Sequence, residues 1–320
     1  MKTLFNLTTS ADDLGRFASR EEMLRLMDGF DGVELMVCGD DARKIVPRER
    51  VFGIHMASFP FWLDFWRGNE RALIDEFGSL DECERYYGGS TREALLERFR
   101  VDLLNADRYH AEYVVFHVSE ASIGESFTGD YRRTDENVID AACELLNALF
   151  DDQPADGPAL LLENLWQPGL TFTRPEMTKR LLDGVRYPNK GFVLDTGHLF
   201  HTNESIQTQS EGLAYINRML DRHGALCEHI RGMHLHQSVT GAYCRAVREH
   251  PPALADTYEG RSRQMFEHAF KVDLHRPFTC PGVGALIHRI GPEYLTLEFI
   301  TENIAQHRAY LREQRQVLAE

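Results

Sequence analysis

The sequence predicts a (β/α)8 barrel, built as a single domain over residues 1–320. Eight short apolar segments occur along the chain, and segments with helical periodicity lie between most of them. This alternation is typical of a parallel sheet covered by helices. A doubly wound open sheet is the alternative, but it favours a glycine-rich phosphate turn after the first strand, and the sequence shows none there. The length of 320 residues suits a barrel that carries insertions.

The eight apolar segments are short, and they lack strict alternation between apolar and polar residues. Strands buried on both faces of a parallel sheet have this pattern. The segments are 3–8, 32–37, 51–56, 113–118, 159–164, 191–196, 230–236 and 293–299. We therefore expect eight parallel strands at these positions.

Helices are predicted from apolar residues at helical spacing and from residues that begin or end helices. Ser90 or Thr91 can cap the start of one helix. Pro175 suits the first turn of another, and Gly184 suits its end. The expected helices cover 90–110, a segment that starts at Thr134, 175–184, a segment that stops near Gly224, and 301–318. Between the second and third strands, the segment 47–50 offers barely one turn.

Two connections are too long to be simple turns, and they cover 57–89 and 237–280. Long loops inside compact domains commonly act as lids or binding loops. The first loop is rich in aromatic residues, namely Phe59, Phe61, Trp62, Phe65 and Trp66. Two interpretations remain open and are compatible. These side chains can close a pocket or stack on a ring, or they can pin the loop as a satellite hydrophobic cluster.

Composition excludes several classes of protein. Hydrophobic residues make up 43% and charged residues 27%, as in ordinary globular proteins. The 35 basic and 50 acidic residues give a net charge of −15, which argues against a surface that neutralises many phosphates, so duplex DNA is not an expected partner. No apolar run suits a membrane span, and no signal peptide is visible. Six cysteines without CxxC spacing indicate reduced thiols in a cytoplasmic protein, and homo-oligomers remain open.

Ionisable residues stand at or just beyond the ends of seven predicted strands. They are Glu34, His55, His117, Glu163, Asp195 with His198, His234 with His236, and Glu298. In a barrel these strand ends face one rim, where the active site is built. So many carboxylates and imidazoles at one mouth are costly without a bound cation. Their nitrogen and oxygen donors suit zinc, manganese, iron or cobalt better than calcium.

The motifs LLLENL, VLDTGHLF, GMHLH and YLTLEF resemble successive strand ends of the xylose isomerase-like TIM barrel superfamily. That superfamily includes endonuclease IV, of AP endonuclease family 2, and the sugar isomerases and epimerases. In the sugar-isomerising members, the resemblance implies one metal held by four residues, here Glu163, Asp195, His234 and Glu298. It also implies that Glu163 and Glu298 move a proton between substrate carbons.

In the endonuclease IV branch, the resemblance implies a larger set of ligands that supports a trinuclear zinc cluster. The additional positions match His55, His117, His198, Asp273 and His275. The Asp-x-His pair at 273–275 matters most, because a single-metal isomerase has no obvious need for it. The chain departs from this branch in the continuation RPFTCPGVG after His275, in the lack of a basic cluster and in three further ways. The spacing from His234 to Asp273 is long, His236 replaces a short polar residue, and the loop after His55 is apolar.

Three functions follow from these observations. The first hypothesis is metal-assisted hydrolysis of a phosphoester other than duplex DNA, with Glu163 bridging two of up to three ions, zinc being the first candidate. The second is a single-metal sugar or sugar phosphate isomerase or epimerase, with Glu163 and Glu298 as acid and base. The third is a non-catalytic barrel that binds a ligand. The residues expected to contact a small-molecule substrate are Glu34, Trp62, Trp66, Asn164 and His236.

Overall fold

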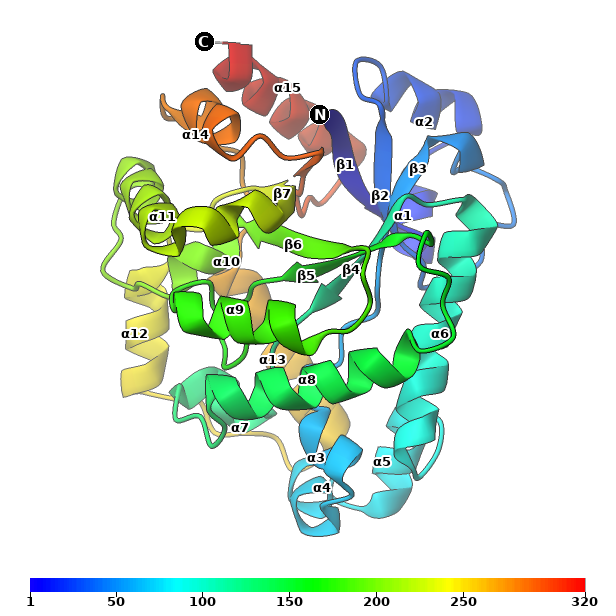
Figure 1. Cartoon of the computed structure of the whole chain (residues 1–320), viewed down its shortest axis with the longest axis vertical. Coiled ribbons are helices and arrows are strands. Elements are labelled where there is room, and N and C mark those ends of the chain that lie inside the picture. The colour runs from blue at the N-terminus through cyan, green and yellow to red at the C-terminus, as the bar shows by residue number, and fades with distance from the viewer. Residues whose placement is uncertain (320) are drawn as a thin grey trace.

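The computed structural model describes residues 1–319 and confirms the predicted barrel (Figure 1). Eight parallel strands pair in chain order, and the last strand closes the ring against the first. The strands are β1 (Lys2–Thr8), β2 (Gly32–Met36), β3 (Val51–His55), β4 (Tyr113–His117), β5 (Ala159–Glu163), β6 (Lys190–Asp195), β7 (Ile230–Leu235) and β8 (Tyr294–Leu297). Each strand overlaps its predicted segment.

Successive side chains along each strand point alternately into the barrel and out toward the helices, and they form two separate hydrophobic cores. Tyr113 and Val115 of β4 pack with Leu161 of β5 in a cluster inside the barrel. The intervening Val114 and Leu160 pack in the larger cluster that the helices cover. Because side chains alternate between the two faces of a strand, every second residue points inward. We call the inward-pointing residues of a strand its inward series. In β4 and β5, the inward series begins with apolar residues inside the barrel and ends with a polar residue at the carboxyl end of the strand.

The outer helices are α1 (Ala11–Gly15), α2 (Arg20–Leu26), α6 (Arg92–Tyr109), α8 (Asp135–Leu149), α9 (Pro175–Gly184), α11 (Gln209–His223), α14 (Val283–Ile290) and α15 (Ile304–Ala319). Among them, α6, α8, α9, α11 and α15 confirm the five predicted ones, whereas α1, α2 and α14 were not predicted. Thr134 caps α8 by accepting from the Asn137 amide, and Gly224 follows α11 with a positive φ of 53°. Thr91 is the N-cap residue of α6, but its side chain makes no capping hydrogen bond. Between β2 and β3, as expected, there is only the short 3-10 helix η1 (Arg48–Arg50).

Both long connections contain helices rather than open loops. The first carries α3 (Leu63–Arg67), α4 (Glu70–Phe77) and α5 (Leu80–Tyr87), and the second carries α12 (Gly241–Glu249) and α13 (Tyr258–Val272). Three shorter helices, α7 (Ile123–Thr128), α10 (Thr196–His201) and the 3-10 helix η2 (Gly224–His229), follow β4, β6 and α11. The helices α3 to α5 gather at one end of the molecule, where α3 contacts α6 and α8 (Figure 1).

The aromatic residues of the first connection are buried against one another. Phe65 stacks on Tyr87 with ring centroids 3.8 Å apart, and Phe59 packs edge-on against Phe99 of α6. Trp62 donates its indole N–H to the Ser119 carbonyl. These contacts support the interpretation as a hydrophobic cluster that pins the connection. No helix within residues 1–319 is both long and apolar enough to cross a membrane.

Candidate metal centre

The polar residues at the rim converge because they share the inward series of the strands. His117 continues the series of Tyr113 and Val115, and Glu163 continues that of Leu161. Strand register aligns them across the barrel. His117 pairs with Glu163 on the neighbouring strand, and Asp195 pairs with His234. Helix α10 adds His198, and the segment after α13 adds Asp273 and His275, so the nine residues predicted as metal ligands lie in one contiguous cluster.

Glu163 occupies the centre of this cluster and is fully buried. Its Oε2 atom lies 3.2 Å from Nε2 of both His55 and His117. Its Oε1 atom lies 3.1 Å from Nδ1 of His234 and 3.3 Å from Nδ1 of His198. The two oxygens of one carboxylate thus face two different sets of imidazoles.

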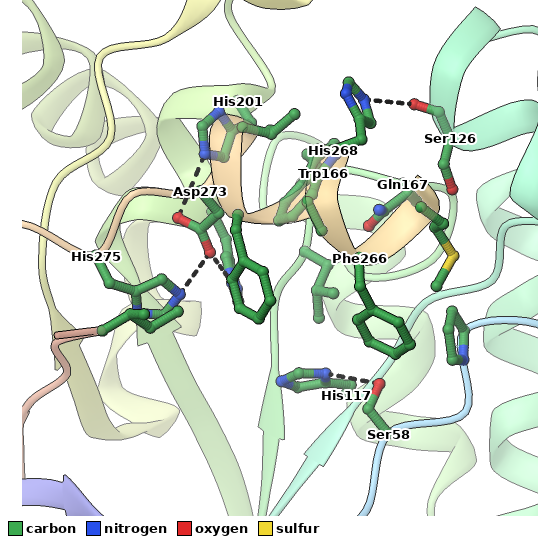
Figure 2. Close-up of a pocket in the computed structure, with 18 of the residues that line it drawn as sticks. Ser58, His117, Ser126, Trp166, Gln167, His201, Phe266, His268, Asp273 and His275 are labelled. Carbon is green, nitrogen blue, oxygen red and sulfur yellow. Dashed lines mark hydrogen bonds and ion pairs between the residues drawn. The ribbon is translucent and has the colours of Figure 1, made fainter. Parts of the chain in front are cut away.

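The first donor group comprises His55, His117 and Glu163, whose donor atoms lie within 4.8 Å of one another. The two imidazole rings are nearly perpendicular, with centroids 4.7 Å apart. His55 Nδ1 lies 3.0 Å from the Met56 carbonyl, which leaves Nε2 free for a ligand. His117 Nδ1 lies 3.4 Å from the Ser58 hydroxyl (Figure 2).

The second donor group comprises Glu163, Asp195, His234 and Glu298. His234 Nδ1 lies 3.1 Å from Glu163 Oε1 and 3.1 Å from Glu298 Oε2. The other nitrogen, Nε2, lies 3.0 Å from Glu34 Oε1 below the rim. Such a carboxylate partner fixes the tautomer and orientation of a metal-binding histidine. This group contains the four residues that the sugar-isomerising pattern requires.

The third donor group comprises His198, His236, Asp273 and His275. Asp273 Oδ2 lies 2.7 Å from His275 Nε2 and 3.1 Å from His198 Nε2 (Figure 2). The Ser238 hydroxyl donates to Asp273 Oδ1 and accepts from the Leu274 amide, which shapes the turn between the two ligands. His275 adopts a positive φ of 45°, an uncommon conformation for a residue other than glycine.

Burial and opposite charges shift the pKa values throughout the cluster. Although burial alone would raise it, neighbouring histidines hold the pKa of Glu163, Asp273 and Glu298 well below the usual range. Carboxylates outweigh burial in the other direction for the imidazoles. They raise the pKa of His55 and His275 to about 9. The pKa values of His198 and His234 are raised well above the usual range for the same reason, whereas burial lowers that of His117.

These imidazoles therefore carry protons on the nitrogens that would bind metal ions. A metal ligand must be a neutral imidazole, so cations and protons compete for the same nitrogens. The donors are carboxylate oxygen and imidazole nitrogen, and they lie close together and are buried except for the partly exposed His117 and Glu298. This set fits transition-metal ions, with zinc as the natural candidate.

A family model described as a xylose isomerase-like TIM barrel matches residues 27–319. The chain belongs to the xylose isomerase-like TIM barrel family. The resemblance predicted from the strand ends is thereby confirmed. A comparison with curated protein sequences gives no match.

Solved structures share the fold of this xylose isomerase-like barrel at low identity. D-psicose 3-epimerase in the presence of D-fructose is 14% identical, with a TM-score of 0.51 over 100% of both chains. L-ribulose 3-epimerase is 12% identical, with a TM-score of 0.50 over 98% of this chain and 93% of its own. A structure described as AsfvAP:AG is 11% identical, with a TM-score of 0.51 over 99% of this chain and 98% of its own. At these identities the likeness shows the fold alone.

The xylose isomerase-like barrel has a cavity of about 1270 Å³ above the metal centre. The first and third donor groups contribute His55, His117, His198, Asp273 and His275 to its floor. Apolar side chains from α7, α13 and the segment after β5 line part of the cavity, among polar and charged residues. They include Phe127, Met265, Phe266, Phe270 and Trp166. Figure 2 shows Phe266 reaching from α13 toward His117 and Ser58.

The predicted substrate contacts need correction. None of Glu34, Trp62, Trp66, Asn164 and His236 is among the described residues that line the cavity. Glu34 lies under the rim, where it accepts from Tyr113 and Thr296 and faces His234. The structure therefore does not support direct substrate contact for these five residues, because each is buried in another role.

Three of the five act on the donor groups or the loop instead. The Asn164 side chain bonds both the amide and the carbonyl of Asp195, so it positions that ligand. Trp62 and Trp66 belong to the buried aromatic cluster of the first connection. An indole side chain that packs and hydrogen-bonds inside a loop has no free face for a substrate.

Sequence reasoning missed several residues of the cavity. His201 is buried one turn beyond His198 on α10, and its Nε2 lies 3.5 Å from Asp273 Oδ1 (Figure 2). The Trp166 ring stands 4.9 Å from the His201 ring. The spacing of three residues from His198 is the signal that could have identified His201, since such residues share a helix face. Phe266 and Phe270 share a face of α13 by the same rule.

Proposed function

We propose that this chain is a divalent-metal-dependent enzyme that hydrolyses a phosphoester bond in a small molecule, at a centre with two or three ions. The observation that carries the proposal is the division of the Glu163 carboxylate. Its Oε2 faces His55 and His117, and its Oε1 faces His234. A carboxylate placed between two donor groups in this way can bridge two ions.

The donor groups together contain more donor residues than a single ion can bind. The second group alone supplies four donors, and a transition-metal site in a protein commonly uses four. Five further donors then remain, namely His55, His117, His198, Asp273 and His275. All but His117, whose side chain is 20% exposed, are buried. Clusters of two or three ions are a recurrent arrangement for phosphoester hydrolysis.

When bound, divalent ions at such a centre would supply an activated water molecule at neutral pH and offset the charge of the phosphoester. The chain's own residues arrange the rest. Glu34 and Asn164 hold His234 and Asp195 in place. His55 and His117 face the cavity, so a substrate that enters meets the first donor group.

The cavity favours a substrate with an anionic head and a larger apolar part. The donor groups form the floor, and Phe266 and Phe270 form part of the opposite wall. Both phenylalanines remain about half exposed, at 51% and 55%, although they line the cavity. Apolar groups that stay exposed beside a polar site commonly bind the apolar part of a ligand.

A second candidate function is epimerisation of a sugar at a single ion. Glu163 and Glu298 flank His234 Nδ1 at 3.1 Å each, as two carboxylates that move a proton between substrate carbons would need. The named structural neighbours that act on sugars favour this candidate over hydrolysis. The additional buried donors favour hydrolysis.

Activity assays on the zinc-loaded protein separate the two candidates. Hydrolysis of bis(p-nitrophenyl) phosphate or p-nitrophenyl phosphate, without conversion of D-fructose or L-ribulose, is the expected result. His117→Asn removes a donor of the first group and should abolish hydrolysis, and His288→Asn on the exposed face of α14 is its matched control. Sugar epimerisation without phosphoester hydrolysis would instead establish the second candidate.

A further inference from the structure

His236 holds a buried nitrogen that no protein atom uses. The side chain is fully buried, and its Nε2 lies 2.8 Å from Asp195 Oδ2, at hydrogen-bond distance. The other nitrogen, Nδ1, has no hydrogen-bond partner within residues 1–319. Unpaired buried polar atoms are rare and call for a partner. With a proton on Nε2 donated to Asp195, the Nδ1 atom presents a lone pair.

The Nδ1 atom of His236 lies next to the other members of the third donor group. His236 Nδ1 lies 3.7 Å from Asp273 Oδ1, which is too far for a hydrogen bond. Two donor atoms that bind one zinc ion at about 2.0–2.2 Å each lie roughly 3–4 Å apart. The separation therefore suits a cation between the two atoms better than direct contact. His198 and His275 complete the set within the same 4.8 Å limit.

The surrounding chain is shaped to admit the His236 ring. A Cβ atom on Gly197 would lie 2.0 Å from Cε1 and 2.3 Å from Nδ1 of His236. Only glycine leaves this space, so the first turn of α10 accommodates the imidazole. The Thr196 hydroxyl fixes the backbone of His236 by donating to its carbonyl. The ring stacks on His275, with centroids 3.9 Å apart and planes within 9°, so one of the two imidazoles has to turn for both nitrogens to face one ion.

We propose that His236 completes a closed metal site with His198, Asp273 and His275, and that this site fastens the second long connection to the barrel. Three nitrogens and one oxygen make four protein donors, the number typical of structural zinc sites. Asp273 follows the last residue of α13, whereas His236 follows β7 and His198 lies on α10. The site thus joins the end of the cavity wall to two elements at the rim.

If the third donor group is a closed structural site, the first donor group is the one that can bind substrate. Four protein donors leave no open position for a substrate, in contrast to catalytic sites, which keep one. The first group has three donors and faces the cavity through His117, whose side chain is 20% exposed. The substrate is therefore expected to bind at His55 and His117. The closed site needs only ion binding by the third group, so it does not depend on the hydrolytic reaction.

Metal content after dialysis against a weak chelator tests the site without an activity assay. His236→Asn should retain one zinc ion fewer per chain than the wild type, or bind that ion at least about tenfold more weakly. His201→Asn is the matched control, because His201 also contacts Asp273 but lies outside the four-donor group. Equal zinc content and affinity in the wild type and His236→Asn would overturn the proposal. If His236→Asn loses one ion but the wild type hydrolyses no phosphoester, the metal site stands and only the proposed function is refuted.

Two further measurements keep the test decisive if His236→Asn does not fold. In zinc-loaded wild-type crystals, an anomalous peak should lie about 2.0–2.1 Å from His236 Nδ1. A third group that is filled without His236, or that holds no ion, would overturn the proposal. Gly197→Ala should displace the ring and loosen the second connection, so that protease cleavage within 237–272 becomes faster in the presence of zinc. Cleavage at the wild-type rate would contradict the fastening role.

Discussion

Zinc binding to this chain is expected to release protons in a number that reflects how many ions bind. The perturbation is a titration of the metal-free protein with zinc at pH 7. Neighbouring carboxylates raise the pKa of His55 and His275 to about 9, and those of His198 and His234 well above the usual range. Each of these imidazoles must lose its proton before it can bind a metal.

The expected magnitude follows from those four histidines. A group with a pKa of about 9 is about 99% protonated at pH 7. The carboxylates Glu163, Asp273 and Glu298 contribute no protons, because their pKa values are already low. Filling all three donor groups should therefore release about four protons per chain. A single ion in the second group should release about one, from His234.

Isothermal titration calorimetry in two buffers of different ionisation enthalpy measures this number. The observed binding enthalpy changes with the buffer enthalpy, and the slope equals the number of protons released. A slope near four supports a centre with several ions. A slope near one would show that a single ion binds, and a slope near zero would refute the assignment of these histidines as ligands.

Four other predictions concern the same centre. Under either candidate function, Glu163→Gln should lower turnover by at least about 100-fold, measured with the loaded enzyme; unchanged turnover and ligand affinity would instead indicate a binding protein. Glu34→Gln should weaken zinc binding about 10–100-fold in a chelator competition, because His234 loses its carboxylate partner; equal affinity would exclude this positioning role. The ionised cluster should contribute most to the stability of the metal-free protein between about pH 5 and 6.5, since its raised histidine pKa values stabilise the fold below about 6.5 and lose effect toward 9, whereas its lowered carboxylate pKa values stabilise it above about 4.5; thermal unfolding that is independent of pH would contradict this. Replacing Phe266 and Phe270 by Ser should raise KM while the unfolding free energy changes by less than about 0.5 kcal/mol per residue, as both side chains are half exposed; a large loss of stability would show that they are core residues.

The strands and the ligands could be predicted because they depend on local pattern. Each buried strand is a short apolar segment, and each ligand except Asp273 and His275 stands at or just beyond the end of one. Glu163 illustrates the connection, since it ends an apolar segment and continues the inward series of β5. The family resemblance then supplied the order in which such residues recur. Asp273 and His275 were found through that order and not through any periodicity.

The roles of other residues depend on contacts that the sequence does not encode locally. Whether Glu34 reaches a substrate or supports His234 depends on how deep in the barrel its side chain lies. In the sequence, His236 is only a departure from the family pattern. Its role becomes visible only in the structure, where Gly197 leaves space for its ring. The helices α12 and α13 turn an apparent loop into a cavity wall. In each case the decisive partner is distant in the sequence.

Elemental analysis of freshly purified protein is the most direct test of a shared metal centre at the rim. The donor groups predict two or three transition-metal ions per chain, with zinc foremost, and a decrease in that number when Glu163 is replaced by Gln. If the protein holds one ion per chain, and replacing His55 or His117 does not change that content, then the metal centre consists of the second donor group alone. Protein that takes up no ion on addition of zinc, manganese, iron or cobalt would contradict the account.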